Sequence, residues 1–106
     1  MRLKASYQEA NVTKNAMKRA YIIVSGSVQG VSYRYYALRE ARHQGITGTV
    51  RNLPNGSVEI IAEGDEDQVS RFIEFCRKGS PSAAVEDVRV TFEKSTGKFS
   101  DFNILG

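Results

Sequence analysis

A glycine-containing segment in the first third of the chain has residue types that could bind an anion. It reads Gly-Ser-Val-Gln-Gly-Val-Ser-Tyr-Arg over residues 26–34. If the segment joins a strand to a helix, free backbone N–H groups and the positive end of the helix dipole favour an anion there. Arg34 would lie in the first helical turn, where its guanidinium can lean back over the loop. Backbone donors and a guanidinium would then hold a phosphoryl group from two sides.

Spacing alone leaves two interpretations of this segment open, because glycine-rich connections from strand to helix are common. It is either an anion site or an ordinary tight turn followed by a surface arginine. It is not a Walker A loop, which ends in Gly-Lys-Ser/Thr, and it lacks the Gly-x-Gly-x-x-Gly spacing of a dinucleotide site. Cys76 does not begin a Cys-x5-Arg phosphatase loop, because position 82 is serine. We therefore exclude a covalent cysteine mechanism.

Other polar and aromatic side chains are weaker candidates. His43 is the single histidine, and on a helix it would lie roughly 14 Å from Arg34 at 1.5 Å per residue. We expect it to be a solvated residue at the helix end. Tyr35 and Tyr36 are expected to pack rather than to stack on a ligand. Solvated surface positions are expected for Arg39, Arg42 and Arg51.

The pattern around the glycine-containing segment predicts a strand before it and a helix after it. Residues 21–27 are β-branched and aromatic up to Gly26, which favours a strand. Ser32 is a suitable N-cap for a helix over residues 33–44, and Gly45 is suited to the C′ position that ends it.

The second half of the chain predicts a hairpin, a helix and two more strands. Residues 47–53 alternate weakly and indicate one strand, residues 57–63 indicate a second, and Pro54-Asn55-Gly56 is a typical turn between them. Asp65 can cap a second helix with apolar residues at three- and four-residue spacing up to Gly79. The remaining strands are predicted at residues 85–93 and 99–104.

This order is βαββαβ with one added C-terminal strand. Each βαβ half needs a right-handed crossover, and burying both helices on one face of an antiparallel sheet gives the ferredoxin-like sandwich. We therefore predict an α+β fold of this class over residues 20–106, preceded by a mobile basic tail over residues 1–19. A chain of 106 residues is expected to hold a single core.

The net charge of +3 is unevenly distributed along the chain. The first 20 residues carry five basic side chains against one acidic, and residues 34–51 carry four arginines against one glutamate. Residues 52–106 hold ten acids and six bases. A small anion would be attracted to residues 34–51, but a polyanion would be repelled by the rest of the domain. We therefore expect no nucleic acid among the partners.

Cysteine content and hydropathy indicate the cellular compartment in which the protein is expected. A single cysteine cannot form an internal disulfide, and no Cys or His spacing typical of a zinc site surrounds it. The sequence has no apolar run of the roughly 18 residues that a membrane span needs, and no signal-peptide pattern at its N-terminus. We expect a cytoplasmic protein without a membrane partner or a bound metal.

Two segments resemble the signatures of the acylphosphatase family. Residues 26–34 resemble the first signature, G-x-V-Q-G-V-x-F/Y-R. Residues 48–58 read Gly-Thr-Val-Arg-Asn-Leu-Pro-Asn-Gly-Ser-Val and are followed five residues later by Gly64. They resemble the second signature, G-aromatic-V-K/R-N-x3-G-x-V-x5-G. Thr49 departs from this pattern, because an aromatic residue is usual there, which leaves the packing beside Asn52 open.

The resemblance implies a hydrolase that cleaves the carboxyl–phosphate bond of small acyl phosphates without a metal ion or other cofactor. The phosphate-binding arginine falls on Arg34 and the water-orienting asparagine on Asn52. The phosphate-binding loop falls on Gln29, Gly30, Val31, Ser32 and Tyr33. Phosphoryl transfer of this kind needs positioning and charge stabilisation, and a carboxylate leaves without a general acid. Inorganic phosphate would be both product and inhibitor, and we expect a monomer.

Alternative functions stay open at this point. The ferredoxin-like fold also serves RNA recognition and small-ligand sensing, but an RNA-binding sheet would show aromatic side chains on strand 57–63, which has none. An acylphosphatase-like domain can also act inside a larger maturation enzyme, which the short chain without a partner domain disfavours. Asn52 could merely stabilise the hairpin turn, although Asn55-Gly56 already suits that role.

Overall fold

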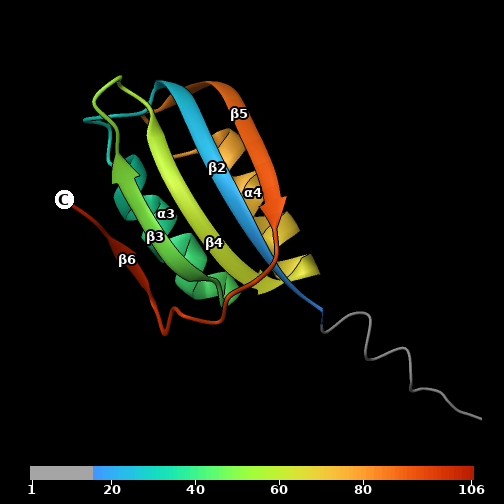
Figure 1. The fold of residues 1–106 in the computed structure, drawn as a ribbon. Coiled ribbons are helices and arrows are strands. Elements are labelled where there is room, and N and C mark those ends of the chain that lie inside the picture. The colour runs from blue at the N-terminus through green and yellow to red at the C-terminus, as the bar shows by residue number, and fades with distance from the viewer. Residues whose placement is uncertain (1–15) are drawn as a thin grey trace, which may run out of the picture.

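The computed structural model describes residues 16–106, in which two helices lie against one face of a five-stranded sheet (Figure 1). The strands are β2 (Met17–Ser27), β3 (Thr47–Asn52), β4 (Val58–Asp65), β5 (Ala84–Glu93) and β6 (Phe102–Ile104). The helices are α3 (Tyr33–Gln44) and α4 (Glu66–Lys78). The strand order across the sheet is β5-β2-β4-β3-β6.

Strand pairing confirms the predicted ferredoxin-like α+β fold and adds one feature to it. β2 pairs with both β4 and β5, and β4 pairs with β3, in each case antiparallel. β6 pairs in parallel with β3, with Gly48 opposite Phe102 and Val50 opposite Ile104. The complete sheet is therefore mixed, and its last strand is shorter than the predicted 99–104. This parallel edge brings the C-terminal residues beside the end of β3.

β2 begins at Met17, earlier than the predicted start at Tyr21. The additional residues pair with β4, and Arg19 lies between two acidic side chains. Its Nη1 donates to Glu63 at 2.9 Å and its Nε donates to Glu93 at 3.0 Å. These carboxylates compensate for the low strand propensity of charged residues. Residues 17–19, which were predicted to be part of the tail over residues 1–19, therefore belong to the sheet. Residues 1–15 of that predicted tail lie outside the described residues.

The helix boundaries use the predicted capping residues, except at Ser32. Gly45 has φ 77° and donates its N–H to carbonyls of the last turn of α3. At the start of α4, Asp65 accepts the Gln68 N–H at 2.8 Å, and the Gln68 side chain accepts the Asp65 N–H at 3.0 Å. The C-terminal end of α3 and the N-terminal end of α4 thus have end groups satisfied by residues that the sequence identifies. Across residues 16–106, neither helix has the length and apolar character needed to cross a membrane.

The core lies between the sheet and the helices. Its buried side chains alternate along β2 and β4 and recur at helical spacing on α3 and α4: Ala20, Ile22, Val24, Val58, Ile60, Ala62, Tyr33, Ala37, Ala41, Val69, Phe72 and Cys76. The same alternation turns Glu59 and Glu63 of β4 to the open face of the sheet. A slip of one residue would put these carboxylates in the core, so the pattern fixes the register of β4.

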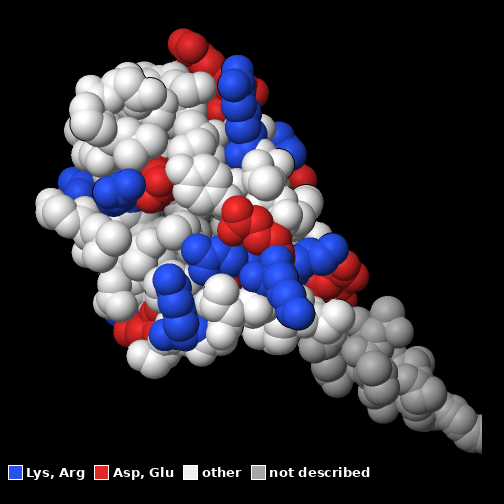
Figure 2. All heavy atoms as spheres, viewed as in Figure 1, with Lys and Arg blue, Asp and Glu red and all other residues white. Residues whose placement is uncertain are grey.

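Glu63 is only 2% exposed although it lies on the face away from the helices. It accepts hydrogen bonds from Arg19, from the backbone and hydroxyl of Thr96, and from the N–H of Gly97. Burial opposes ionisation of Glu63, but these donors outweigh it and lower its pKa to about 2. Acidic and basic side chains adjoin on this face (Figure 2). The charged Glu63 carboxylate therefore anchors the segment that follows β5.

Glu63→Gln should lower the free energy of unfolding at pH 7 by about 3 kcal/mol, because Arg19 and the 96–97 backbone lose a charged acceptor. The folded-state pKa lies below the ordinary value of 4.5. The contribution is therefore complete above about pH 5 and is lost as the pH falls towards 2. Urea unfolding of both proteins should show the difference shrinking over this range.

Glu66→Gln is the matched control, since Glu66 is half exposed and pairs with Lys18 on the surface. It should cost at most about 1 kcal/mol. Equal destabilisation by the two substitutions, or a difference at Glu63 that does not depend on pH, would show that the carboxylate does not anchor this segment.

Candidate active site

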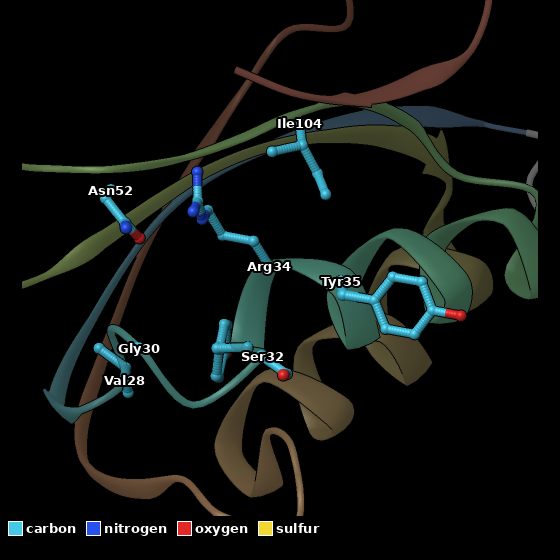
Figure 3. Close-up of a pocket in the computed structure, with 8 residues that line it drawn as sticks. Val28, Gly30, Ser32, Arg34, Tyr35, Asn52 and Ile104 are labelled. Carbon is cyan, nitrogen blue, oxygen red and sulfur yellow. The ribbon is translucent and has the colours of Figure 1, made fainter. Parts of the chain in front are cut away.

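A small pocket opens where the end of β2, the start of α3, the end of β3 and β6 meet (Figure 3). It has a volume of about 180 Å³ and is lined by Val28, Gly30, Ser32, Tyr33, Arg34, Tyr35, Asn52 and Ile104. Pockets for drug-sized ligands range from roughly 300 to 1,000 Å³, so this one suits a smaller group. The pocket brings together Arg34, Asn52 and three of the five predicted loop residues.

The loop before α3 is shaped by residues in the left-handed region. Gly30 has φ 75° and Ser32 has φ 64°. Ser32 is the only non-glycine residue with positive φ between residues 16 and 106, and such a conformation costs roughly 1–3 kcal/mol. Alternation of right- and left-handed residues forms a concavity of backbone N–H groups that binds anions. The strained backbone therefore has the form of an anion-binding loop.

The start of α3 has an unusual charge distribution. The Ser32 side chain makes no capping hydrogen bond, so the prediction that it caps the helix is wrong. The physical reason is its left-handed backbone, since a capping residue is normally extended. The first turn of α3 has no acidic residue and instead carries Arg34. The positive end of the helix is thus left without a protein anion, and a bound anion would be favoured there.

Two side-chain hydrogen bonds attach the loop and the first residue of α3 to α4 and to the segment that follows α4. The Ser80 hydroxyl donates to the Val31 carbonyl at 2.6 Å, and the Tyr33 hydroxyl donates to the Cys76 carbonyl at 2.8 Å. Tyr33 is 1% exposed, and burial raises the pKa of its hydroxyl. Its side chain therefore anchors the loop in the core, and only its backbone is available to a ligand.

Arg34 and Asn52 extend towards each other from α3 and β3 (Figure 3). Arg34 Nη1 donates to the Leu105 carbonyl at 3.4 Å, which leaves most of the five guanidinium N–H donors unused by this contact. Asn52 Oδ1 is buried and accepts no hydrogen bond from any of residues 16–106. A buried acceptor without a partner costs about 1–3 kcal/mol. Such an oxygen is typical of a group that binds a water or a ligand.

Two of the predicted loop residues do not line the pocket. Val31 packs against the core. The Gln29 amide donates to the carbonyls of Leu53 and Ser57, both at 2.8 Å. Its side chain therefore ties the loop to the β3–β4 hairpin that carries Asn52.

The hairpin turn is stabilised without Asn52. Asn55 Oδ1 accepts the backbone N–H two residues further on at 3.0 Å, and Gly56 has φ 93°. Alternation along β3 puts Asn52 on the helix side of the sheet and Thr49 on the open side. Thr49 in place of the usual aromatic residue therefore does not alter the packing beside Asn52.

Three residues that line the pocket were not predicted from the sequence: Val28, Tyr35 and Ile104. Tyr35 was expected to pack, but it is 54% exposed and lies at the surface, where it contacts Tyr36. The helical period would have shown this, because Tyr35 lies two positions from the buried Tyr33 and points to another side of α3. Ile104 had no such signal, since its place depends on the parallel pairing of β6.

Other titratable groups do not form a second reactive centre. Cys76 is fully buried, and burial raises the pKa of its thiol to about 12, which agrees with the exclusion of a cysteine nucleophile. His43 is exposed on the last turn of α3. Within residues 16–106, no three His, Cys, Asp or Glu side chains gather as a metal site. The predicted surface arginines are exposed: Arg39, Arg42 and Arg51.

The family model and the sequence relatives that match this chain are acylphosphatases. The sequence model of the acylphosphatase family matches residues 20–104. An acylphosphatase from Syntrophobacter fumaroxidans is 49% identical over 87 residues, which cover 82% of this chain and 90% of that protein. The crystal structure of acylphosphatase from Bacillus subtilis matches with a TM-score of 0.82 at 39% identity, over 84% of this chain and 99% of that one. Full-length HypF matches with a TM-score of 0.74 at 25% identity, over 85% of this chain but only 12% of that one.

Gln29→Glu should weaken the binding of orthophosphate and lower the free energy of unfolding by about 1–3 kcal/mol. A carboxylate cannot donate to the Leu53 and Ser57 carbonyls and is repelled by them, so the loop separates from the hairpin. Titration with orthophosphate and urea unfolding measure the two effects. Asn55→Ala, which loosens the turn but not the loop, should lower stability alone. If Gln29→Glu bound orthophosphate as the wild type does, the side chain would not position the loop.

Proposed function

The chain belongs to the acylphosphatase family, whose activity is the hydrolysis of acyl phosphates, and we propose that Arg34 and Asn52 carry out this reaction in the pocket beside α3. The chain is thus an enzyme that cleaves the bond between a carboxyl group and phosphate. One observation supports the assignment of these residues above all others. The left-handed loop, the Arg34 guanidinium and the unpaired Asn52 oxygen converge on a single small pocket.

The phosphoryl group would bind between the backbone of residues 30–33 and Arg34. The loop supplies N–H donors at the positive end of α3, and Arg34 supplies a planar guanidinium that matches two phosphate oxygens. The loop is fixed before the substrate arrives, because Ser80 and Tyr33 hold it in place. Such preorganised donors stabilise the charge that spreads over the phosphoryl oxygens in the transition state.

Asn52 would hold the attacking water. Its buried Oδ1 can accept a hydrogen bond from the water and so direct the water's lone pair at phosphorus. The bond from the water oxygen to phosphorus forms while the bond from phosphorus to the carboxyl oxygen breaks. Bringing the water into this position supplies the proximity and orientation on which the reaction depends.

The residues that line the pocket, all within residues 16–106, include no Asp, Glu or His that could act as a general acid. The leaving group of an acyl phosphate explains why none is needed. A carboxylate is a weak base and leaves with the bonding electron pair without being protonated. An alkoxide, which leaves from a phosphate monoester, needs a proton donor. The pocket therefore favours acyl phosphates over monoesters.

Several finer properties remain predictions. Orthophosphate, which shares the donors of the phosphoryl group, is expected to be a competitive inhibitor. A monomeric state and a mechanism without a metal ion are expected from the sequence and the family resemblance. A cytoplasmic location rests on the single cysteine, which is buried.

The direct test is the hydrolysis of benzoyl phosphate and acetyl phosphate, compared with phenyl phosphate, with and without EDTA. We expect each acyl phosphate to be cleaved as fast with the chelator as without it, because all donors are protein groups. Phenyl phosphate should be a poor substrate. Loss of activity with EDTA, or a preference for phenyl phosphate, would contradict the proposal.

Asn52→Ala and Arg34→Lys should impair different properties of the enzyme, namely turnover in the first variant and phosphate binding in the second. Asn52→Ala removes the group that orients the water, so kcat should fall about 10²- to 10³-fold while orthophosphate still inhibits. Arg34→Lys replaces the planar guanidinium, which can bind two phosphate oxygens at once, by a compact ammonium group. Inhibition by orthophosphate should therefore weaken strongly and KM should rise. Steady-state kinetics and inhibition constants on the same preparations measure both effects.

The urea midpoint of each variant separates chemistry from folding. If Asn52→Ala kept its turnover and only lost stability, Asn52 would be a structural residue of the hairpin. If Arg34→Lys kept its KM and its phosphate inhibition, the guanidinium would not bind the phosphoryl group.

A further inference from the structure

Part of the pocket has no role in binding phosphate or water. Among residues 16–106, five large apolar side chains are well exposed: Met17, Tyr35, Phe92, Ile104 and Leu105. Tyr35 and Ile104 line the pocket at 54% and 39% exposure, and the Leu105 carbonyl accepts a hydrogen bond from Arg34. Two of these exposed apolar side chains thus lie at the edge of the pocket that holds Arg34 and Asn52, and exposed apolar groups beside polar ones mark a binding surface.

The direction of the reaction places the leaving group on this surface. In an in-line displacement, the attacking and leaving oxygens lie on opposite sides of phosphorus. If Asn52 holds the water, the acyl group must leave on the side of Arg34 away from Asn52. Figure 3 shows Asn52 on one side of Arg34, and Tyr35 and Ile104 on the other.

We propose that Tyr35 and Ile104 form the acyl-binding site of the enzyme and that they favour substrates with an aromatic or bulky apolar acyl group. This inference rests on the proposed roles of Arg34 and Asn52. The site is half open, so it suits a flat or branched group laid against it rather than an enclosed one. A small acyl group such as acetyl would reach little of this surface.

The Tyr35 ring is held in position before a substrate binds. It makes an edge-to-face contact with Tyr36, with ring centroids 5.8 Å apart, and the Arg39 guanidinium lies 5.9 Å from its centroid. Both contacts stabilise one orientation of an exposed ring. An aromatic side chain fixed in this way can bind an apolar group with little loss of conformational entropy. Ile104 is held in turn by the pairing of β6 with β3.

The test compares two substrates that differ only in the acyl group. Tyr35→Ala and Ile104→Thr should each lower the ratio of kcat/KM for benzoyl phosphate over acetyl phosphate about 5- to 20-fold, as expected for a lost apolar contact. Tyr35→Phe keeps the apolar ring and should keep the ratio. Inhibition by orthophosphate, which has no acyl group, should be the same in Tyr35→Ala and the wild type.

Phe92→Ala is the matched control, because Phe92 is also 54% exposed but lies opposite Ala20, at the other end of β2 from the pocket. It should leave both substrates unaffected. A ratio that stays constant in Tyr35→Ala and Ile104→Thr, or that falls equally in Phe92→Ala, would overturn the acyl-binding site alone. A wild-type protein that cleaves neither substrate would overturn the proposed function and the acyl-binding site with it.

Discussion

The two hydrogen bonds of the Gln29 amide are the interaction on which the site depends. They join the loop before α3 to the Leu53 and Ser57 carbonyls, and so connect the proposed phosphate-binding loop to the strand that carries Asn52. Catalysis by positioning requires that the phosphoryl group and the water keep a constant separation. The Gln29 amide supplies a direct link between the two parts, in addition to the packing of the sheet.

The sheet brings these parts together through β4. Val58 at the start of β4 is paired on one side with Val24 of β2 and on the other with Asn52 of β3. The end of β2, from which the loop departs, therefore lies level with the end of β3. Because the register is fixed by burial of alternate residues, the placement of Asn52 follows from the same packing that stabilises the domain. The site needs no separate scaffold.

The sequence predicted those elements whose signals are local. Gly45 and Asp65 end and begin helices through their own backbone and side chain, and the two motifs identified Arg34 and Asn52. Features that depend on distant partners were not predictable. The early start of β2 requires Glu63 and Glu93 around Arg19, and the position of Ile104 requires a short parallel strand. The left-handed backbone of Ser32 was also missed, because serine before a helix normally indicates a cap.

The central place of β2 also has a consequence for the order of folding. Arg19 of this first described strand bonds to Glu63, 44 positions later, and to Glu93, 74 positions later. Closing such long loops costs entropy before any contact is gained, and folds dominated by distant pairings form slowly. During synthesis, β2 has no strand to pair with until β4 and then β5 have left the ribosome. The sheet that supports the pocket therefore cannot be complete before the residues of β4 and β5 are available.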